Sequence, residues 1–169
     1  MQKRKAAQPL KREEATKVAP KPIAVSVDMT PQTVSMTYSE VSLAYGALGF
    51  MGSKLNPHSF DLNTKIRACR RALKDHDEDL SDMIQKLTAR MAVKHSEDGE
   101  IVRDKDGNFA IKQPDFDIER RTYLRTTVEV HCPVWHPNEL SWMQDVTVQG
   151  VEDGFVSSVL ENLGPLYQE

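Results

Sequence analysis

The sequence predicts an α+β protein built on one long helix, against which a shorter return helix folds back. Apolar residues recur at alternating steps of four and three across residues 61–94, which is the spacing of a heptad seam. Residues 127–132 (TVEVHC) alternate as a strand does, and Asp106-Gly107 between two short extended runs indicates a tight hairpin. We therefore expect a helical hairpin with a β-hairpin tip, packed on a small sheet.

The elements before the long helix are short. Residues 23–27 (IAVSV) alternate and predict a strand, whereas residues 28–33 contain Pro31 and predict a turn. A helix is expected over residues 39–50, with the hydroxyl of Thr37 or Ser39 capping its first turn. Apolar residues crowd most faces of this helix, so we expect it to be buried.

The long helix is the dominant element. At about 1.5 Å per residue it extends about 50 Å, which exceeds what a domain of this size can enclose. Part of the seam must therefore meet a return helix of this chain, another copy or a different protein. The seam consists of Leu62, Ile66, Cys69, Leu73, His76, Leu80, Met83 or Ile84, Leu87 and Met91. The polar face of the long helix is basic from Lys65 to Lys74 and acidic from Asp75 to Asp82.

Further elements follow the hairpin tip. Pro114-Asp115 predicts the start of the return helix over residues 115–126, which directly precedes the alternating strand. The remaining expectations are a helical turn over residues 138–143, a strand over 146–148, and a last helix over 152–163 closed by Gly164-Pro165.

Charge divides the chain into a basic N-terminal arm, residues 1–22, and a single domain, residues 23–169. The arm holds seven Lys and Arg against two Glu, a net of +5, which leaves −8 for the domain because the total is −3. An acidic domain repels nucleic acid, so only the arm could bind it, and an acidic protein surface is the other candidate partner. The arm residues predicted to make such contacts are Lys3, Arg4, Lys5, Lys11 and Arg12.

Composition predicts a folded protein of the cell interior. Hydrophobic residues make up 39% and charged residues 28%, and the apolar runs are too short to cross a membrane. Residues 1–21 stay polar, unlike a signal peptide, so we expect a location in the cytoplasm. The two cysteines, Cys69 and Cys132, lie among apolar residues and predict buried, reduced thiols.

Two glycine- and acid-containing segments resemble ligand loops but lack essential residues. Gly46, Gly49 and Gly52 have no preceding strand, lysine or opening helix, which a phosphate loop requires. Residues 104–108 match the first ligands of a calcium loop, but Phe109 replaces its glycine and no glutamate follows. We predict a hairpin tip there, with no cofactor.

A catalytic or metal site is not predicted either. His131, Cys132 and His136 are close in sequence, but adjacent residues of a strand face opposite sides, so at most two could share a metal. A cysteine nucleophile needs a histidine fixed beside the thiol, which no spacing here indicates. The sequence therefore predicts a protein that is not an enzyme and binds no metal.

The predicted protein interface combines the seam with two aromatic residues. Trp135, Trp142 and Tyr123 are expected in the core, and any of these rings that is exposed is the best interface anchor. His76, within the seam, is either a pH-sensitive or register-setting residue or a histidine that reaches solvent. The candidate interface residues are Leu62, Ile66, Leu73, His76, Leu80, Met83, Leu87, Trp135 and Trp142.

The middle of the chain resembles an uncharacterised family of small proteins from tailed bacteriophages. The resemblance rests on the glycine-bearing helix, the long charged helix, the acidic segment DGEIVRDKDGNFAI, the Phe-containing helix, the strand segment TVEVHCPVW and the Leu-Pro-Leu-like close. It covers about three quarters of the chain, excluding the basic arm and the Trp-rich residues 133–145. It implies a phage origin and transfers no catalytic residue.

These observations lead to two expectations for function. The first is a structural or assembly protein of a tailed phage that contacts other phage proteins or copies of itself, in the host cytoplasm and the virion. The second is a phage-encoded inhibitor or regulator of a host protein, since an acidic body can occupy a basic site on a host enzyme. A third use, nucleic-acid binding through the arm, remains open.

Overall fold

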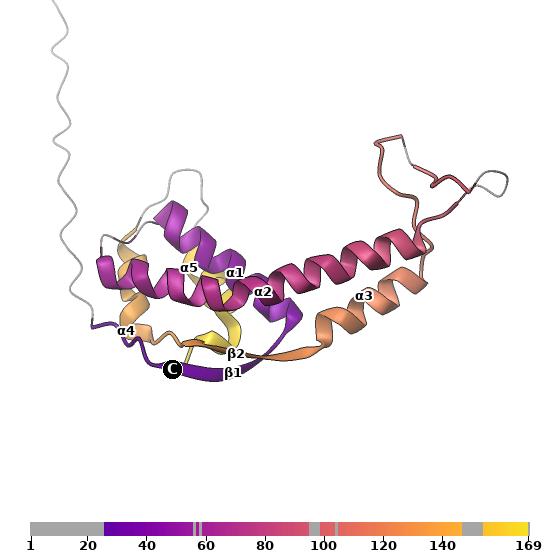
Figure 1. Cartoon of the computed structure of the whole chain (residues 1–169). Helices are drawn as coiled ribbons and strands as arrows, with labels where there is room; N and C mark the ends of the chain where they lie inside the picture. Colours follow the sequence, from indigo (N-terminus) through magenta and orange to yellow (C-terminus); the bar gives the residue numbers. More distant parts are fainter. Residues whose placement is uncertain are drawn as a thin grey trace, which may run out of the picture.

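The structure is a computed structural model that describes residues 26–55, 57, 59–94, 99–103, 105–146 and 154–168. It is α+β, as predicted, with a small two-stranded antiparallel sheet. The elements are β1 (Pro31–Thr37), α1 (Tyr38–Phe50), α2 (Phe60–Met91), α3 (Asp115–Arg125), β2 (Thr127–Pro133), α4 (Pro137–Leu140) and α5 (Phe155–Leu163), labelled in Figure 1. Short helical segments follow α1, α4 and α5: a π-helix at Met51–Leu55 and 3₁₀ turns at Ser141–Asp145 and Gly164–Leu166.

Helix α2 spans 32 residues and confirms the predicted long helix, since no break interrupts it. It begins where the Ser59 hydroxyl accepts a hydrogen bond from the Leu62 amide at 3.4 Å. Its first half lies in a head formed with α1, α4, α5 and the sheet, and its second half leaves the head beside α3 (Figure 1). We call the paired second half of α2 and α3 the two-helix projection.

Helix α1 begins at a capping box. The Glu40 amide donates to the Thr37 hydroxyl at 3.3 Å, and the Thr37 amide donates to the Glu40 carboxylate at 2.7 Å. Two otherwise unpaired amides are satisfied in this way, which fixes the turn from β1 into α1. Of the two predicted caps, Thr37 and Ser39, the structure has Thr37, and Val41, Ala44 and Leu48 are fully buried.

The sheet pairs β1 with β2 in a different place from the one the sequence predicted. The register sets Val34 opposite Val130 and Met36 opposite Val128, so the alternate side chains of both strands face the core. The predicted strand at residues 23–27 is wrong where it can be compared, because Ser26 and Val27 are not in a strand and residues 23–25 lie outside the described residues. The predicted turn at residues 28–33 overlaps β1, since Pro31 occupies the first strand position, where proline is tolerated.

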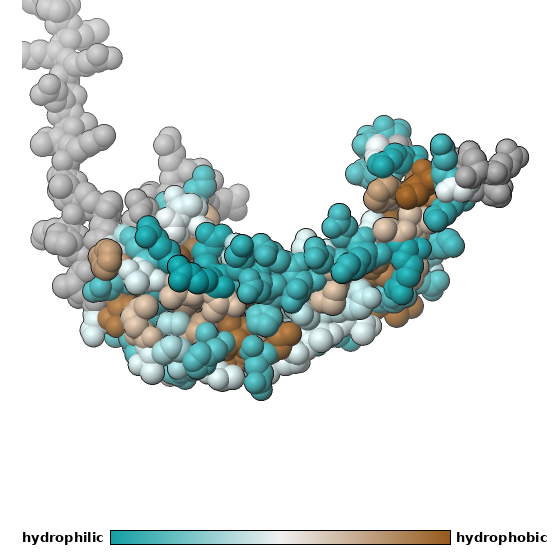
Figure 2. Space-filling model, viewed as in Figure 1, coloured by the Kyte–Doolittle hydropathy of each residue, from teal (hydrophilic) through white to brown (hydrophobic). Residues whose placement is uncertain are grey.

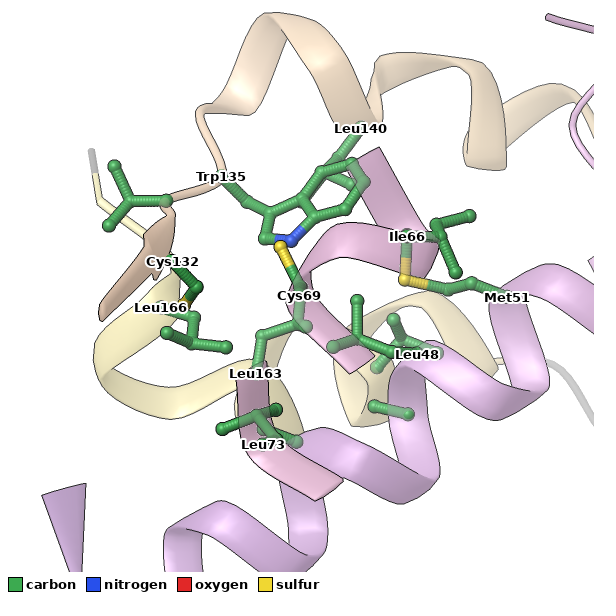
Figure 3. Packing of buried hydrophobic residues seen from close by; sticks show 14 of the residues in the cluster. Leu48, Met51, Ile66, Cys69, Leu73, Cys132, Trp135, Leu140, Leu163 and Leu166 are labelled. Atoms are coloured by element: carbon green, nitrogen blue, oxygen red, sulfur yellow. The ribbon is translucent and has the colours of Figure 1, made fainter. Parts of the chain in front are cut away.

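The core of the head joins residues from both ends of the chain. Buried side chains of α1, the first half of α2, both strands and α5 meet around Leu73, Trp135 and Leu163 (Figure 3). The Trp135 amide donates to the Leu166 carbonyl at 2.6 Å, and the Gln168 amide donates back to the Trp135 carbonyl at 2.8 Å. These bonds hold the last described residues against the segment that follows β2.

Three predicted C-terminal features have different outcomes. The helical turn expected at residues 138–143 is formed by α4 and the 3₁₀ turn after it. The last helix begins at Phe155 and ends at Leu163, where Gly164 forms its C-cap, close to the prediction. Residues 147–153, which include most of the predicted strand at 146–148 and the start predicted for the last helix, lie outside the described residues.

The far end of the projection is held by single bridges. Between α2 and α3 the chain forms isolated antiparallel bridges that join Ala92 to Ile111, Lys94 to Ile101 and Arg103 to Phe109. The Arg103 guanidinium lies 4.5 Å from the centre of the Phe109 ring and donates to the Gly107 carbonyl at 2.7 Å. Asp104, a member of the expected hairpin turn, lies outside the described residues.

We expect Leu73→Ala to lower the free energy of unfolding by about 2–5 kcal/mol, because it opens a cavity in a sealed core. Leu73 is 0% exposed, whereas Leu43 on α1 is 49% exposed and provides a matched leucine control. Urea denaturation of both variants measures the difference. A loss for Leu73→Ala no larger than for Leu43→Ala would contradict this description of the core.

Candidate functional site

The first half of the predicted interface seam is covered by the chain itself. Leu62, Ile66 and Leu73 are at most 3% exposed and belong to the core of the head. Helix α1 and the elements from β2 onward cover them, which the sequence could not show because these elements are distant along the chain. The expected surplus of apolar surface on this half of α2 is therefore absent.

The second half of the seam is covered by α3. Leu80 is 4% exposed and Leu87 is 1% exposed, and the other buried apolar residues of the projection are Ala92 and Phe116. None of these four residues belongs to the core cluster of the head. The seam thus continues into a second, thinner core, which the Arg90–Glu119 ion pair between α2 and α3 supports from outside.

Two predicted seam residues keep partial access to solvent. His76 follows the last seam residue of the head core, and Met83 lies within the projection, and both are half-buried. Of the nine predicted interface residues, only these two present surface to a partner in this conformation. The other seven have their side chains inside the fold.

Trp135 and Trp142 are core residues, as expected from the sequence, and neither is an exposed interface anchor. Trp135 is 0% exposed and Trp142 is 5% exposed. The Trp135 ring lies beside Cys69 and Leu140 (Figure 3). The prediction that both residues belong to the protein interface is therefore wrong for this fold, because the chain encloses both rings.

The surface of the projection offers other groups to a partner. Ile118 on α3 is 58% exposed, and Ile101 near the tip is 37% exposed. At the base of the projection α2 carries the acidic residues that the sequence identified, of which Asp75, Glu78 and Asp79 are exposed. Lys74 pairs with Glu78 at 3.2 Å across one turn, which leaves this stretch acidic overall. We take the projection as the candidate functional site.

A buried ion pair in the head was not predicted. The Lys65 ammonium lies 2.6 Å and 2.7 Å from the two carboxylate oxygens of Glu139, and the side chains are 0% and 1% exposed. The ammonium also lies 5.0 Å from the centre of the Trp135 ring. The sequence placed Lys65 on the polar face of the long helix, and this is wrong because α4 brings a carboxylate to it.

Glu139 also organises the backbone around it. Its carboxylate accepts hydrogen bonds from the Asp28 amide at 2.8 Å and the His136 amide at 2.9 Å. The Thr30 amide donates to the Asp28 carboxylate at 2.8 Å, and this bond, with the Thr30 hydroxyl next in importance, holds the pKa of Asp28 below its usual value. The start of the described chain is thereby fixed to α4, and the cluster is structural.

The cysteines are buried, as predicted, and make no accessible nucleophile. The Cys69 thiol donates to the Pro133 carbonyl at 3.2 Å, and its interaction with Cys132, followed by burial, holds its pKa far above the usual value. On the exposed side of β2, the His131 Nδ1 atom lies 3.3 Å from the Thr33 hydroxyl oxygen. Cys132 faces the core. Opposite orientation separates these neighbours, as the alternation of a strand requires.

The described residues contain no group of three or more His, Cys, Asp or Glu side chains placed to hold a metal ion. Nor does any helix within the described ranges combine the length and apolar character needed to cross a membrane. The basic arm residues Lys3, Arg4, Lys5, Lys11 and Arg12 lie outside the described residues.

Comparison with known proteins finds no matching family model, and no significant match among the curated proteins or the solved structures. The candidate site is therefore interpreted from its own contacts, exposure and charge.

The buried pair predicts strong coupling between Lys65 and Glu139. We expect Lys65→Met and Glu139→Gln each to lower the free energy of unfolding by about 3–5 kcal/mol, since each leaves a buried charge without its partner. The double variant removes both charges, so its loss should be smaller than the sum by about 1 kcal/mol or more. Urea denaturation of the four proteins measures this. Additive losses would show that the two groups do not interact.

Proposed function

We propose that this protein is not an enzyme and acts through protein–protein contacts, as a structural or assembly protein of a tailed bacteriophage. The contacts would be made with other phage proteins or with copies of itself, in the host cytoplasm and in the virion. The resemblance of the middle of the chain to small phage proteins supports the origin, and the two-helix projection supports the mode of action.

The single observation that carries this proposal is the projection. Two helices leave the head and share few buried apolar side chains, all outside the main core (Figure 1). Isolated helices gain most of their stability from packing, so a pair with such a thin core is stabilised when a partner covers it. The exposed Ile118 and the half-buried Met83 provide apolar surface for that contact.

The distribution of polarity along the molecule agrees with this use. Hydrophilic side chains dominate the visible face of α2, while apolar side chains gather along the lower edge of the projection and at its tip (Figure 2). A partner that approaches along that edge avoids the acidic stretch of α2. The contact would combine a small apolar centre with a polar rim, which is the usual composition of an interface.

We also propose the finer architecture that the sequence predicts. Helices α2 and α3 would form a helical hairpin, and the bridged residues between them a β-hairpin tip, packed as a unit on the small sheet. The bridges from Ala92 to Ile111 and from Arg103 to Phe109 support this description. The basic arm, residues 1–22, would lie along a neighbouring protein, and residues 23–169 would form the single domain.

A second candidate is a phage-encoded inhibitor or regulator of a host protein. It is favoured by the exposed acidic residues at the base of the projection, where Asp75, Glu78 and Asp79 lie within about one turn of α2. Such a stretch complements a basic site and accelerates association with it. The two candidates use the same projection and differ in the partner.

We expect Ile118→Glu to weaken association with the partner at least tenfold, because it places a charge in the apolar centre of the contact. Leu43→Glu is the matched control, since Leu43 is comparably exposed but lies on α1 in the head. Light scattering tests self-association, and titration calorimetry tests binding to a purified particle protein. Equal effects of the two variants, or no association of the native chain in either assay, would contradict the proposal.

Mass spectrometry of purified particles of the encoding phage separates the two candidates. We expect the chain to be present in particles in a fixed number of copies, or in assembly intermediates. Its absence from both, combined with an Ile118-dependent complex with a host protein, would overturn the structural role and establish the regulatory one.

A further inference from the structure

A pocket in the head lies between the end of α1 and the first half of α2, away from the projection. It has a volume of about 290 Å³ and is lined by Gly49, Gly52, Ser53, Asn63, Ile66, Arg67 and Arg70. Two of these residues are arginines separated by three positions on one helix, so both guanidinium groups border the same space. No lining residue carries a negative charge.

Arg70 is held in place within this pocket and one of its donors is unused. Its guanidinium lies 4.6 Å from the centre of the Tyr45 ring, which orients the plane of the group. The Arg70 Nε atom is buried and has no hydrogen-bond partner among the described residues. A buried donor without an acceptor is destabilising, so an acceptor oxygen of a ligand brought within its reach would be stabilising.

Gly49 and Gly52 line the pocket on the side of α1 and the π-helical segment. A Cβ atom at Gly49 would lie 3.7 Å from the Arg70 guanidinium carbon, and one at Gly52 would lie 3.4 Å from Ile66. The glycine spacing seen in the sequence therefore has a use other than a phosphate loop. The absence of a side chain at Gly49 lets the Arg70 guanidinium lie against the backbone of α1, at the wall of the pocket.

The positive charge in the pocket is not neutralised by its surroundings. Arg67 and Arg70 take part in none of the ion pairs of the described residues, which join Lys65, Lys74 and Arg90 to carboxylates. The nearby carboxyl end of α1 contributes about half a negative charge, well short of two arginines. A monoanion would leave the pocket positive, whereas a dianion balances it.

We propose that this pocket binds a phosphate-monoester group. The Nε and Nη donors of Arg70 form a fork that matches two oxygens of one anion, and Arg67 supplies the second charge. A phosphate monoester carries about −1.5 to −2 charge at pH 7, which fits two guanidinium groups better than a carboxylate does. The net acidity of residues 23–169 disfavours a polyanion, so a single phosphate group on a small molecule or a phosphorylated side chain is the ligand class.

Nuclear magnetic resonance of the full ¹⁵N-labelled chain tests this. The Arg70 Nε–H signal is followed while inorganic phosphate, O-phosphoserine or acetate is added at constant ionic strength and pH 7. We expect a saturable shift with both phosphate compounds and at least tenfold weaker binding of acetate. Tighter binding of O-phosphoserine than of inorganic phosphate indicates that an organic phosphate is the ligand, and the reverse order indicates free phosphate.

Three variants make the result specific to the pocket. Arg70→Gln should abolish binding, and Arg67→Gln, at an exposed position that leaves the fold intact, should weaken it about tenfold. Arg71→Gln is the control, because Arg71 is an exposed arginine of the same helix that does not line the pocket. A shift that does not saturate, acetate binding as tight as phosphate, or equal losses in Arg67→Gln and Arg71→Gln would overturn the proposal.

Discussion

Helix α2 is too long for one compact core to cover. At about 1.5 Å per residue its 32 residues extend about 48 Å, and its apolar seam has to be covered along that whole length. The chain does this with two sets of elements. Helix α1, the π-helical segment after it and β2 cover the seam as far as Leu73, and α3 packs along the half that holds Leu80 and Leu87. The division into a head and a projection follows from this single fact.

The two parts differ in how firmly they are built. The head has a continuous core, a capping box at Thr37 and Glu40, and a buried ion pair between Lys65 and Glu139 that ties α2 to α4. Buried pairs of this kind add little net stability but strongly disfavour arrangements that separate the charges. The projection has a thin core and an ion pair at its surface. A rigid head that presents a less stable projection suits a protein whose contacts are made by the projection.

The sequence predicted local helices and strands well, but it predicted contacts between residues distant in the sequence poorly. The long helix, the α1 cap and β2 were predicted because each depends on neighbours a few residues away. The position of β1 was missed because Pro31 reads locally as a turn, although pairing with β2 accommodates it at the strand end. The interface prediction treated seam residues such as Leu62 as surplus, and they are covered by elements far away in the chain. Arg70 and its pocket gave no local signal beyond the glycine spacing.

The α+β class, the 3.5-residue periodicity of α2 and the burial of Cys69 and Cys132 follow from patterns of apolar residues along the chain, so the sequence alone predicts them. Which side chains meet is seen only in the folded protein. Lys65 is a buried partner of Glu139 because α4 brings its carboxylate to α2, and Arg70 borders a pocket because α1 and its π-helical extension place Gly49 and Gly52 beside it. Contacts between residues distant in sequence depend on how elements pack, and helical or strand periodicity carries no record of that packing.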